Sequence, residues 1–145
     1  MRSKSLVDTE HFAKTVLESI SAAPHSGAAV LALSGELGSG KTAFVKALAK
    51  ELGVEETVTS PTFVIEKIYK LSHSRFKNLV HVDAYRLESA HELEVLGFKE
   101  LLQNAENLVA IEWPERVAEI VPVDATRINF TFINDTEREI ELIYG

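Results

Sequence analysis

Eight consecutive residues have the types and spacing that suit phosphate binding: Gly35-Glu36-Leu37-Gly38-Ser39-Gly40-Lys41-Thr42. Their glycines permit the backbone geometry that turns successive N–H groups toward phosphate oxygens. A helix beginning near Lys41 would add the positive end of its dipole. In a loop of this pattern Lys41 reaches the β- and γ-phosphates, and the Thr42 hydroxyl can ligate Mg²⁺. The segment therefore predicts a site for a nucleoside triphosphate.

The flanking sequence supplies the context that such a loop requires. Residues 28–34 form a short apolar run, as expected of a central parallel strand that is buried on both faces. Residues 42–53 have a helical pattern, and Gly53 suits its C-terminal cap. A Gly-rich turn that matched by chance would need neither element, so the context favours phosphate binding.

Two acidic residues end other short apolar strands and are candidates to complete a magnesium site. Asp83 ends the strand predicted at residues 79–83, and Glu112 ends the one at residues 108–112. The carboxyl ends of parallel strands meet at one edge of a sheet, where a phosphate-binding loop also lies. A carboxylate there can complete the Mg²⁺ shell, directly or through water. The pattern does not decide which acid ligates Mg²⁺ and which orients water.

Four further features each have a purely structural interpretation beside a functional one. The segment Thr59-Ser60-Pro61-Thr62 could act as a switch that senses a γ-phosphate, although a turn at a strand entry is the simpler interpretation. Trp113, the single tryptophan, could stack on a ligand or pack against the following proline. His81 could be catalytic, but a structural residue within a strand is the simpler interpretation. Arg86 could pair with a phosphate or a partner, but a surface ion pair is the simpler interpretation.

Two more helices are predicted from apolar periodicity. Residues 8–23 read as an amphipathic helix that Asp8 or Thr9 can cap. Residues 88–102 have a helical pattern in which Gly97 is a weak point.

The remaining pattern predicts strands. Residues 63–71 are rich in β-branched and aromatic side chains, and residues 128–132 alternate between apolar and polar types. Asn134-Asp135 would then turn the chain into a second strand, which gives a C-terminal hairpin. Alternating helices and strands indicate an α/β domain with a mixed but largely parallel sheet.

The bulk composition bounds the class of protein. A length of 145 residues, with 46% hydrophobic and 26% charged, fits one compact domain over residues 1–145. No apolar run approaches the roughly 18 residues that cross a bilayer. The lack of cysteine excludes disulfides and thiolate chemistry, so we expect a cytoplasmic protein. A net charge of −7 without a basic block argues against strong direct binding to nucleic acid.

Four motifs occur together in one order and spacing: G-E-L-G-S-G-K-T at 35–42, S-P-T-F at 60–63, H-V-D-A-Y-R-L at 81–87 and I-E-W-P-E at 111–115. In these motifs the chain resembles the TsaE family, also called YjeE, which are small bacterial ATPases needed for the threonylcarbamoyl modification of adenosine 37 in tRNA. The resemblance runs from the N-terminal helix to about residue 120. The first motif is generic, whereas the other three together are highly specific.

The resemblance implies a P-loop NTPase-like fold and a role for individual residues. Thr42 and Glu112 would bind Mg²⁺, and Lys41 would bind the terminal phosphates of ATP. Asp83 would be needed for hydrolysis, and Thr62 would have a switch-like role. The implied nucleotide-binding residues are the loop Gly35, Glu36, Leu37, Gly38, Ser39, Gly40, Lys41 and Thr42, with Ala43, Trp113 and Glu115, and Thr9 near the adenine.

The resemblance also implies partners. In the family TsaD, paired with TsaB, transfers the threonylcarbamoyl group to tRNA, and TsaE binds that pair and hydrolyses ATP to renew the cycle. Contact with tRNA would then be indirect. The alternatives are a small-molecule P-loop kinase and a nucleotide-binding adaptor without catalysis. A kinase often closes a lid with arginines over the transferred phosphate, and the longest irregular connection here, around residues 72–78, is too short for one, which disfavours the kinase. We therefore expect an ATPase that is weak without its partners.

Overall fold

The computed structural model describes residues 1–23, 26–36, 38–54, 66–73 and 75–143. The segment at residues 59–62, interpreted as a switch or a turn, and the start of the strand predicted at residues 63–71 lie outside these ranges. The strands are β1 (Arg2–Ser3), β2 (Ala29–Gly35), β3 (Glu66–Lys70), β4 (Asn78–Asp83), β5 (Asn107–Glu112), β6 (Thr126–Phe132) and β7 (Arg138–Ile143).

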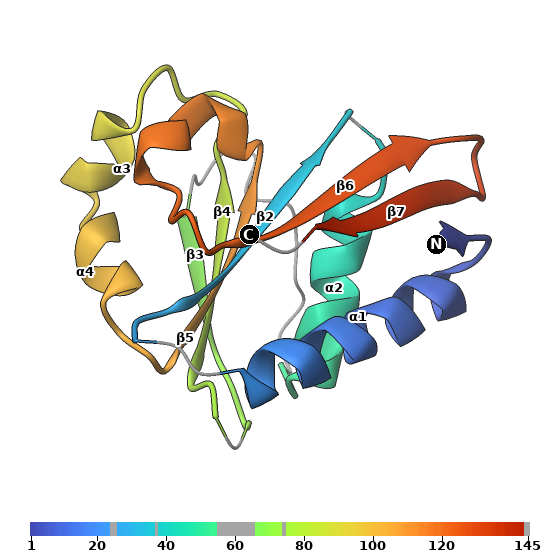
Figure 1. Ribbon diagram of the computed structural model, residues 1–145, viewed down its shortest axis with the longest axis horizontal. Helices are drawn as coiled ribbons and strands as arrows, with labels where there is room; N and C mark the ends of the chain where they lie inside the picture. The colour runs from blue at the N-terminus through green and yellow to red at the C-terminus, as the bar shows by residue number, and fades with distance from the viewer. Residues whose placement is uncertain (24–25, 37, 55–65, 74, 144–145) are drawn as a thin grey trace.

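The strands of the described residues form one mixed sheet in the order β1-β7-β6-β2-β5-β4-β3 (Figure 1). The four central strands, β6, β2, β5 and β4, run parallel to one another. The outer strands pair antiparallel: β3 with β4, β7 with β6, and β1 with β7. The predicted mixed α/β sheet and the C-terminal hairpin are confirmed, and the parallel part occupies the centre of the sheet.

Helices cover both faces of this sheet. The helices are α1 (Leu6–Ala22), α2 (Lys41–Glu51), α3 (His91–Val95), α4 (Phe98–Leu102) and the 3-10 helix η1 (Pro114–Ile120). Figure 1 shows α1 and α2 together on one face, while α3 and α4 lie on the other. No helix in the described ranges is long and apolar enough to cross a membrane.

Alternate residues along the central strands enter two separate cores. Leu33 packs in the core that α1 and α2 cover, whereas Ala32 packs in the core beneath α3, α4 and η1. This alternation follows from the period of two along a strand. The same parity along β4 and β5 turns His81, Asp83 and Glu112 toward the face that α2 covers.

The first helix begins earlier than the sequence predicts. Ser5 is its N-cap, and the Ser5 hydroxyl accepts a hydrogen bond from the Asp8 N–H at 3.2 Å. The predicted caps, Asp8 and Thr9, therefore lie inside α1. Leu6 and Val7 of the first turn are apolar yet exposed, so this turn adds little to the buried face of the helix.

The helix predicted at residues 88–102 is two short helices, so that prediction was wrong in its continuity. Gly97 lies between α3 and α4 with φ 81 and ψ 24, in the left-handed region. A residue in this conformation ends the regular i to i−4 pattern, and glycine adopts it at little cost.

Candidate functional site

The Gly-rich loop joins the end of β2 to the start of α2. Gly38 has φ 78 and Gly40, the N-cap of α2, has φ 106, so both use backbone conformations that other residues rarely adopt. A Cβ on Gly38 would meet no described atom within 4 Å. Ser39 Oγ is buried without a hydrogen-bond partner in the described structure, as an atom that awaits a ligand would be. The loop therefore has the geometry and the unmet polar group that fit a bound phosphate.

Lys41 lies folded against the loop and is 4% exposed. Its ammonium donates hydrogen bonds to the carbonyl oxygens of Gly35 and, at 3.4 Å, of Glu36. Its Nζ also lies 3.6 Å from the centroid of the Trp113 ring. Burial lowers the pKa of Lys41, and the charges of Glu112, Glu115 and Asp83 oppose that shift. An anion in the loop would replace these neutral carbonyl acceptors with a better partner.

Glu112 is held at the N-terminal end of α2 by two side chains. Thr42 Oγ1 donates to its carboxylate oxygens at 3.2 and 3.4 Å, and His81 Nε2 lies 2.5 Å from Oε2. Both His81 and Glu112 are buried, at 0% and 3% exposed. His81 thus has a more specific place than the structural residue the sequence suggested, since it contacts the candidate metal ligand directly.

Asp83 lies at the end of β4, directly opposite Glu112 in the β4–β5 register. The carboxylate is half-buried and accepts a hydrogen bond from the Tyr85 N–H at 3.0 Å. Burial raises the pKa of Asp83, which the Tyr85 hydrogen bond partly offsets. A raised pKa makes this carboxylate a better proton acceptor than an exposed aspartate.

Trp113 follows Glu112 in an uncommon backbone conformation. Its φ of 60 and ψ of 51 lie in the left-handed region, where it is the single non-glycine residue among those described. Such a conformation costs a non-glycine residue about 1–2 kcal/mol. It places the indole against Lys41 and against Tyr85, whose ring centroid lies 4.9 Å away. We did not predict a role for Tyr85 from the sequence, although its ring packs against Trp113 beside the loop.

The remaining predicted residues lie in varied places. Thr9 is fully buried within α1, and its hydroxyl is 2.7 Å from Ser3 Oγ. Glu115 is exposed in the first turn of η1, close enough for its charge to act on Lys41. Roles for these two residues toward a nucleotide stay predictions.

Four further predicted residues belong to the loop, to the first turn of α2 or to the switch-like segment. Glu36 is exposed in the loop, and Ala43 is half-buried in the first turn of α2. Leu37 and Thr62 lie outside the described residues. The nucleotide-binding role expected of Leu37 and the switch role expected of Thr62 therefore stay predictions too.

A divalent cation would find few protein ligands here. No group of three or more His, Asp or Glu side chains in the described ranges is placed to hold a metal. Thr42 Oγ1 and the Glu112 carboxylate are adjacent oxygen donors, which suit Mg²⁺. Because Mg²⁺ commonly takes its other ligands from phosphates and water, this sparse donor set fits a metal that arrives with a nucleotide.

Comparison with known proteins agrees with this arrangement. The family described as "Threonylcarbamoyl adenosine biosynthesis protein TsaE" matches residues 3–140. The chain belongs to the TsaE family. The matched range includes the loop, both strand-end acids and the start of β7.

Individual TsaE proteins are similar to this chain in sequence, and one solved structure is similar in fold. The tRNA threonylcarbamoyladenosine biosynthesis protein TsaE of Borreliella burgdorferi is 42% identical over 95 residues, which are 66% of this chain and 66% of that protein. TsaE of Rickettsia bellii is 32% identical over 139 residues, 95% of this chain and 92% of that protein. The crystal structure of YdiB from Bacillus subtilis superposes with a TM-score of 0.73 at 29% identity and covers 99% of this chain and 83% of that one. This likeness confirms the predicted P-loop NTPase-like fold.

Proposed function

We propose that this TsaE protein is a Mg²⁺-dependent ATPase that serves the threonylcarbamoyl modification of tRNA by acting on the TsaB–TsaD pair. The family supports the pathway, since its relatives are named for threonylcarbamoyladenosine biosynthesis. The observation that carries the proposed chemistry is the contact of Thr42 with Glu112 beside the loop, at 3.2 Å. These two side chains, on different elements, meet where a metal between them would face phosphates in the loop.

The residues of the site have separable tasks in this proposal. The loop N–H groups and Lys41 bind the phosphates, while Thr42 and Glu112 hold Mg²⁺. Bound Mg²⁺ would neutralise charge that develops on the transferred phosphoryl group. His81 fixes the orientation of the Glu112 carboxylate through the contact of its Nε2. Asp83 orients the attacking water and accepts its proton, for which its raised pKa is suited.

A small-molecule kinase would need a pocket for the phosphate acceptor beside the loop. A cavity of about 440 Å³ lies between the C-terminal ends of α1 and α2, lined by residues such as Leu17, Ser21 and Glu51. It lies at the opposite end of α2 from Lys41, so this cavity cannot be that pocket. The family's part in threonylcarbamoyladenosine biosynthesis supports hydrolysis by water, timed by a protein complex.

The test is phosphate release from MgATP by the wild type and by Asp83→Asn, each alone and with purified TsaB and TsaD. We expect slow release alone, faster release with the pair, and a loss of about 100-fold or more in the variant. Asp124→Asn, which changes an exposed acid outside the site, serves as the matched control and should behave as the wild type. If phosphate release is fast, does not change with TsaB and TsaD, and rises with a metabolite that accepts phosphate, the protein is a kinase instead.

A further inference from the structure

Arg138 is the first residue of β7, and its side chain leaves the hairpin on the face that carries the loop. In register it lies opposite Ser3 of β1 and Phe132 of β6. Side chains alternate along a strand, so Arg138 shares its face with Ile140, which is buried in the core beneath α1 and α2. The predicted motifs do not include Arg138, and nothing in the local sequence distinguishes it from a surface residue of a hairpin.

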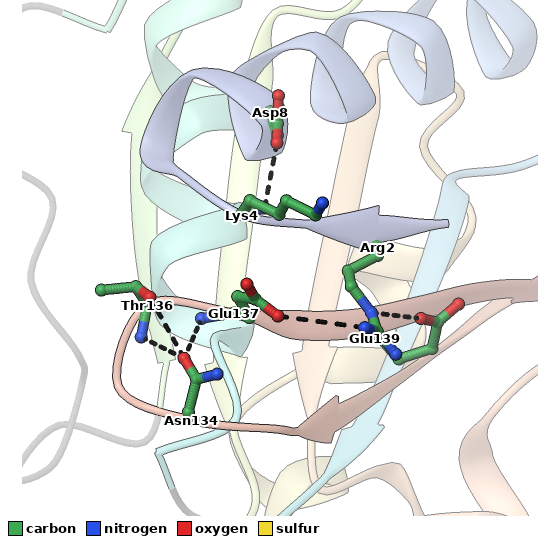
Figure 2. A network of polar contacts seen from close by, with 7 residues as sticks. All are labelled: Arg2, Lys4, Asp8, Asn134, Thr136, Glu137 and Glu139. Atoms are coloured by element: carbon green, nitrogen blue, oxygen red, sulfur yellow. Dashed lines mark hydrogen bonds and ion pairs between the residues drawn. The ribbon is translucent and has the colours of Figure 1, made fainter.

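The neighbours of Arg138 in the chain, Glu137 and Glu139, point the other way and are paired. Arg2 contacts Glu137 at 3.9 Å and Glu139 at 3.6 Å, and Figure 2 shows Arg2 between the two carboxylates. The two acids that flank Arg138 in the chain are therefore engaged with a different cation on the opposite face.

The Arg138 side chain lies directly against the backbone of Gly40. An ideal Cβ built on Gly40 would be 2.6 Å from Arg138 Nη1, 2.7 Å from its Cδ and 3.1 Å from its Cζ. Gly40 is the N-cap of α2 and immediately precedes Lys41. The absence of a side chain at this position is therefore what lets a guanidinium from the C-terminal hairpin reach the Gly-rich loop.

The guanidinium has no hydrogen bond or ion pair with any residue in the described ranges, although it is half-buried. An arginine is always charged, and burying a charge without a partner is costly. The chain carries 22 acidic residues against 15 Lys and Arg, so carboxylates for pairing are abundant. A cation that remains without one, at the edge of a phosphate-binding loop, is placed for an anion that comes from outside the protein.

We propose that Arg138 contacts the phosphates of the bound nucleotide and so adds a second cation to the loop beside Lys41. The inference rests on the proposed function, because it assumes that the loop binds a nucleotide. A planar guanidinium donates two parallel hydrogen bonds to phosphate oxygens, which gives both charge and direction. The C-terminal hairpin thereby becomes part of the nucleotide site instead of a mere edge of the sheet.

Equilibrium binding tests this role without any turnover. The affinities of Arg138→Gln for MgATP and for inorganic pyrophosphate are measured by calorimetry beside the wild type. We expect a loss of about tenfold or more for both probes, as for the loss of a hydrogen bond to a charged group. Arg2→Gln removes a cation from the same sheet edge but not from the loop, and should leave both affinities within twofold of the wild type.

Thermal unfolding without nucleotide shows whether the variant remains folded. If Arg138→Gln does not fold, Arg138→Lys replaces it, since it keeps the charge and loses the paired donors; a smaller loss for both probes is then expected.

Three outcomes would overturn the inference. Unchanged affinity in the Arg138 variant would exclude a phosphate contact while leaving the proposed function intact. Weaker MgATP binding with unchanged pyrophosphate binding would place the guanidinium on the nucleoside and not on the phosphates. Failure of the wild type itself to bind either probe would overturn the proposed function, and this inference with it.

Discussion

Gly40→Ala is the substitution that tests the described loop geometry most sharply. A non-glycine residue in a left-handed conformation costs roughly 1–2 kcal/mol, and Gly40 has φ 106. The new methyl group would also lie 2.6 Å from Arg138 Nη1 and 2.7 Å from its Cδ, so the arginine must move. Overpacking of this kind costs about 1 kcal/mol when a flexible side chain can yield. We therefore expect Gly40→Ala to lower the free energy of unfolding by about 2–3 kcal/mol.

Gly38→Ala is the matched control. Gly38 has φ 78, and a Cβ placed there would meet no described atom within 4 Å. Only the cost of the left-handed backbone, about 1–2 kcal/mol, should therefore remain. Urea unfolding without nucleotide measures both variants, and Arg138→Ala in each background closes a double-mutant cycle. We expect Arg138→Ala to recover about 1 kcal/mol of stability with Gly40→Ala and none with Gly38→Ala. Equal behaviour in the two backgrounds would refute the contact between Arg138 and the loop.

Three further predictions concern stability and are checked by the same unfolding measurement. Arg75→Ala should lower the free energy of unfolding by about 1–3 kcal/mol, because Arg75 Nη1 donates to the carbonyls of Ser21 and Ala23 at the end of α1. Lys99→Ala, which removes an exposed ion pair, should lower it by less than about 1 kcal/mol. Equal losses of stability in the two variants would contradict this prediction. His81→Ala should cost about 2–3 kcal/mol, because it leaves the buried Glu112 carboxylate without its ring partner, and a neutral result would show that the contact is not formed. Asp83→Asn should raise the free energy of unfolding at pH 7, since burial raises the pKa of Asp83 and so disfavours its ionised form in the folded state above that pKa. This gain should shrink as the pH falls through the raised pKa, and a gain that does not change with pH would point to another cause.

The loop and the strand-end acids were predictable because they depend on local rules. The glycine spacing of the loop needs no tertiary knowledge, and the run before it has the composition of a buried central strand. Once β4 and β5 are taken as parallel neighbours, their last residues must meet at one edge, as Asp83 and Glu112 do.

Other features depend on register and on spatial order, which the sequence does not contain in readable form. The His81 contact with Glu112 requires knowing which residues of β4 and β5 lie side by side. The approach of Arg138 to Gly40 requires that the hairpin pair with the far side of β2, where Gly35 lies opposite Phe130. Prediction from the local pattern was wrong where the signal is weak, as at the cap of α1, because the residues after Ser5 are exposed and do not mark the start of a helix.

We propose that the loop and Glu112 form one site for a nucleotide with Mg²⁺. The most direct measurement is the affinity for ATP with and without Mg²⁺, in the wild type and in Glu112→Gln, which keeps the shape of the side chain. We expect Mg²⁺ to tighten ATP binding about tenfold or more in the wild type and to have little effect in the variant. The same Mg²⁺ effect in both proteins would contradict the assignment of Glu112 as the metal ligand.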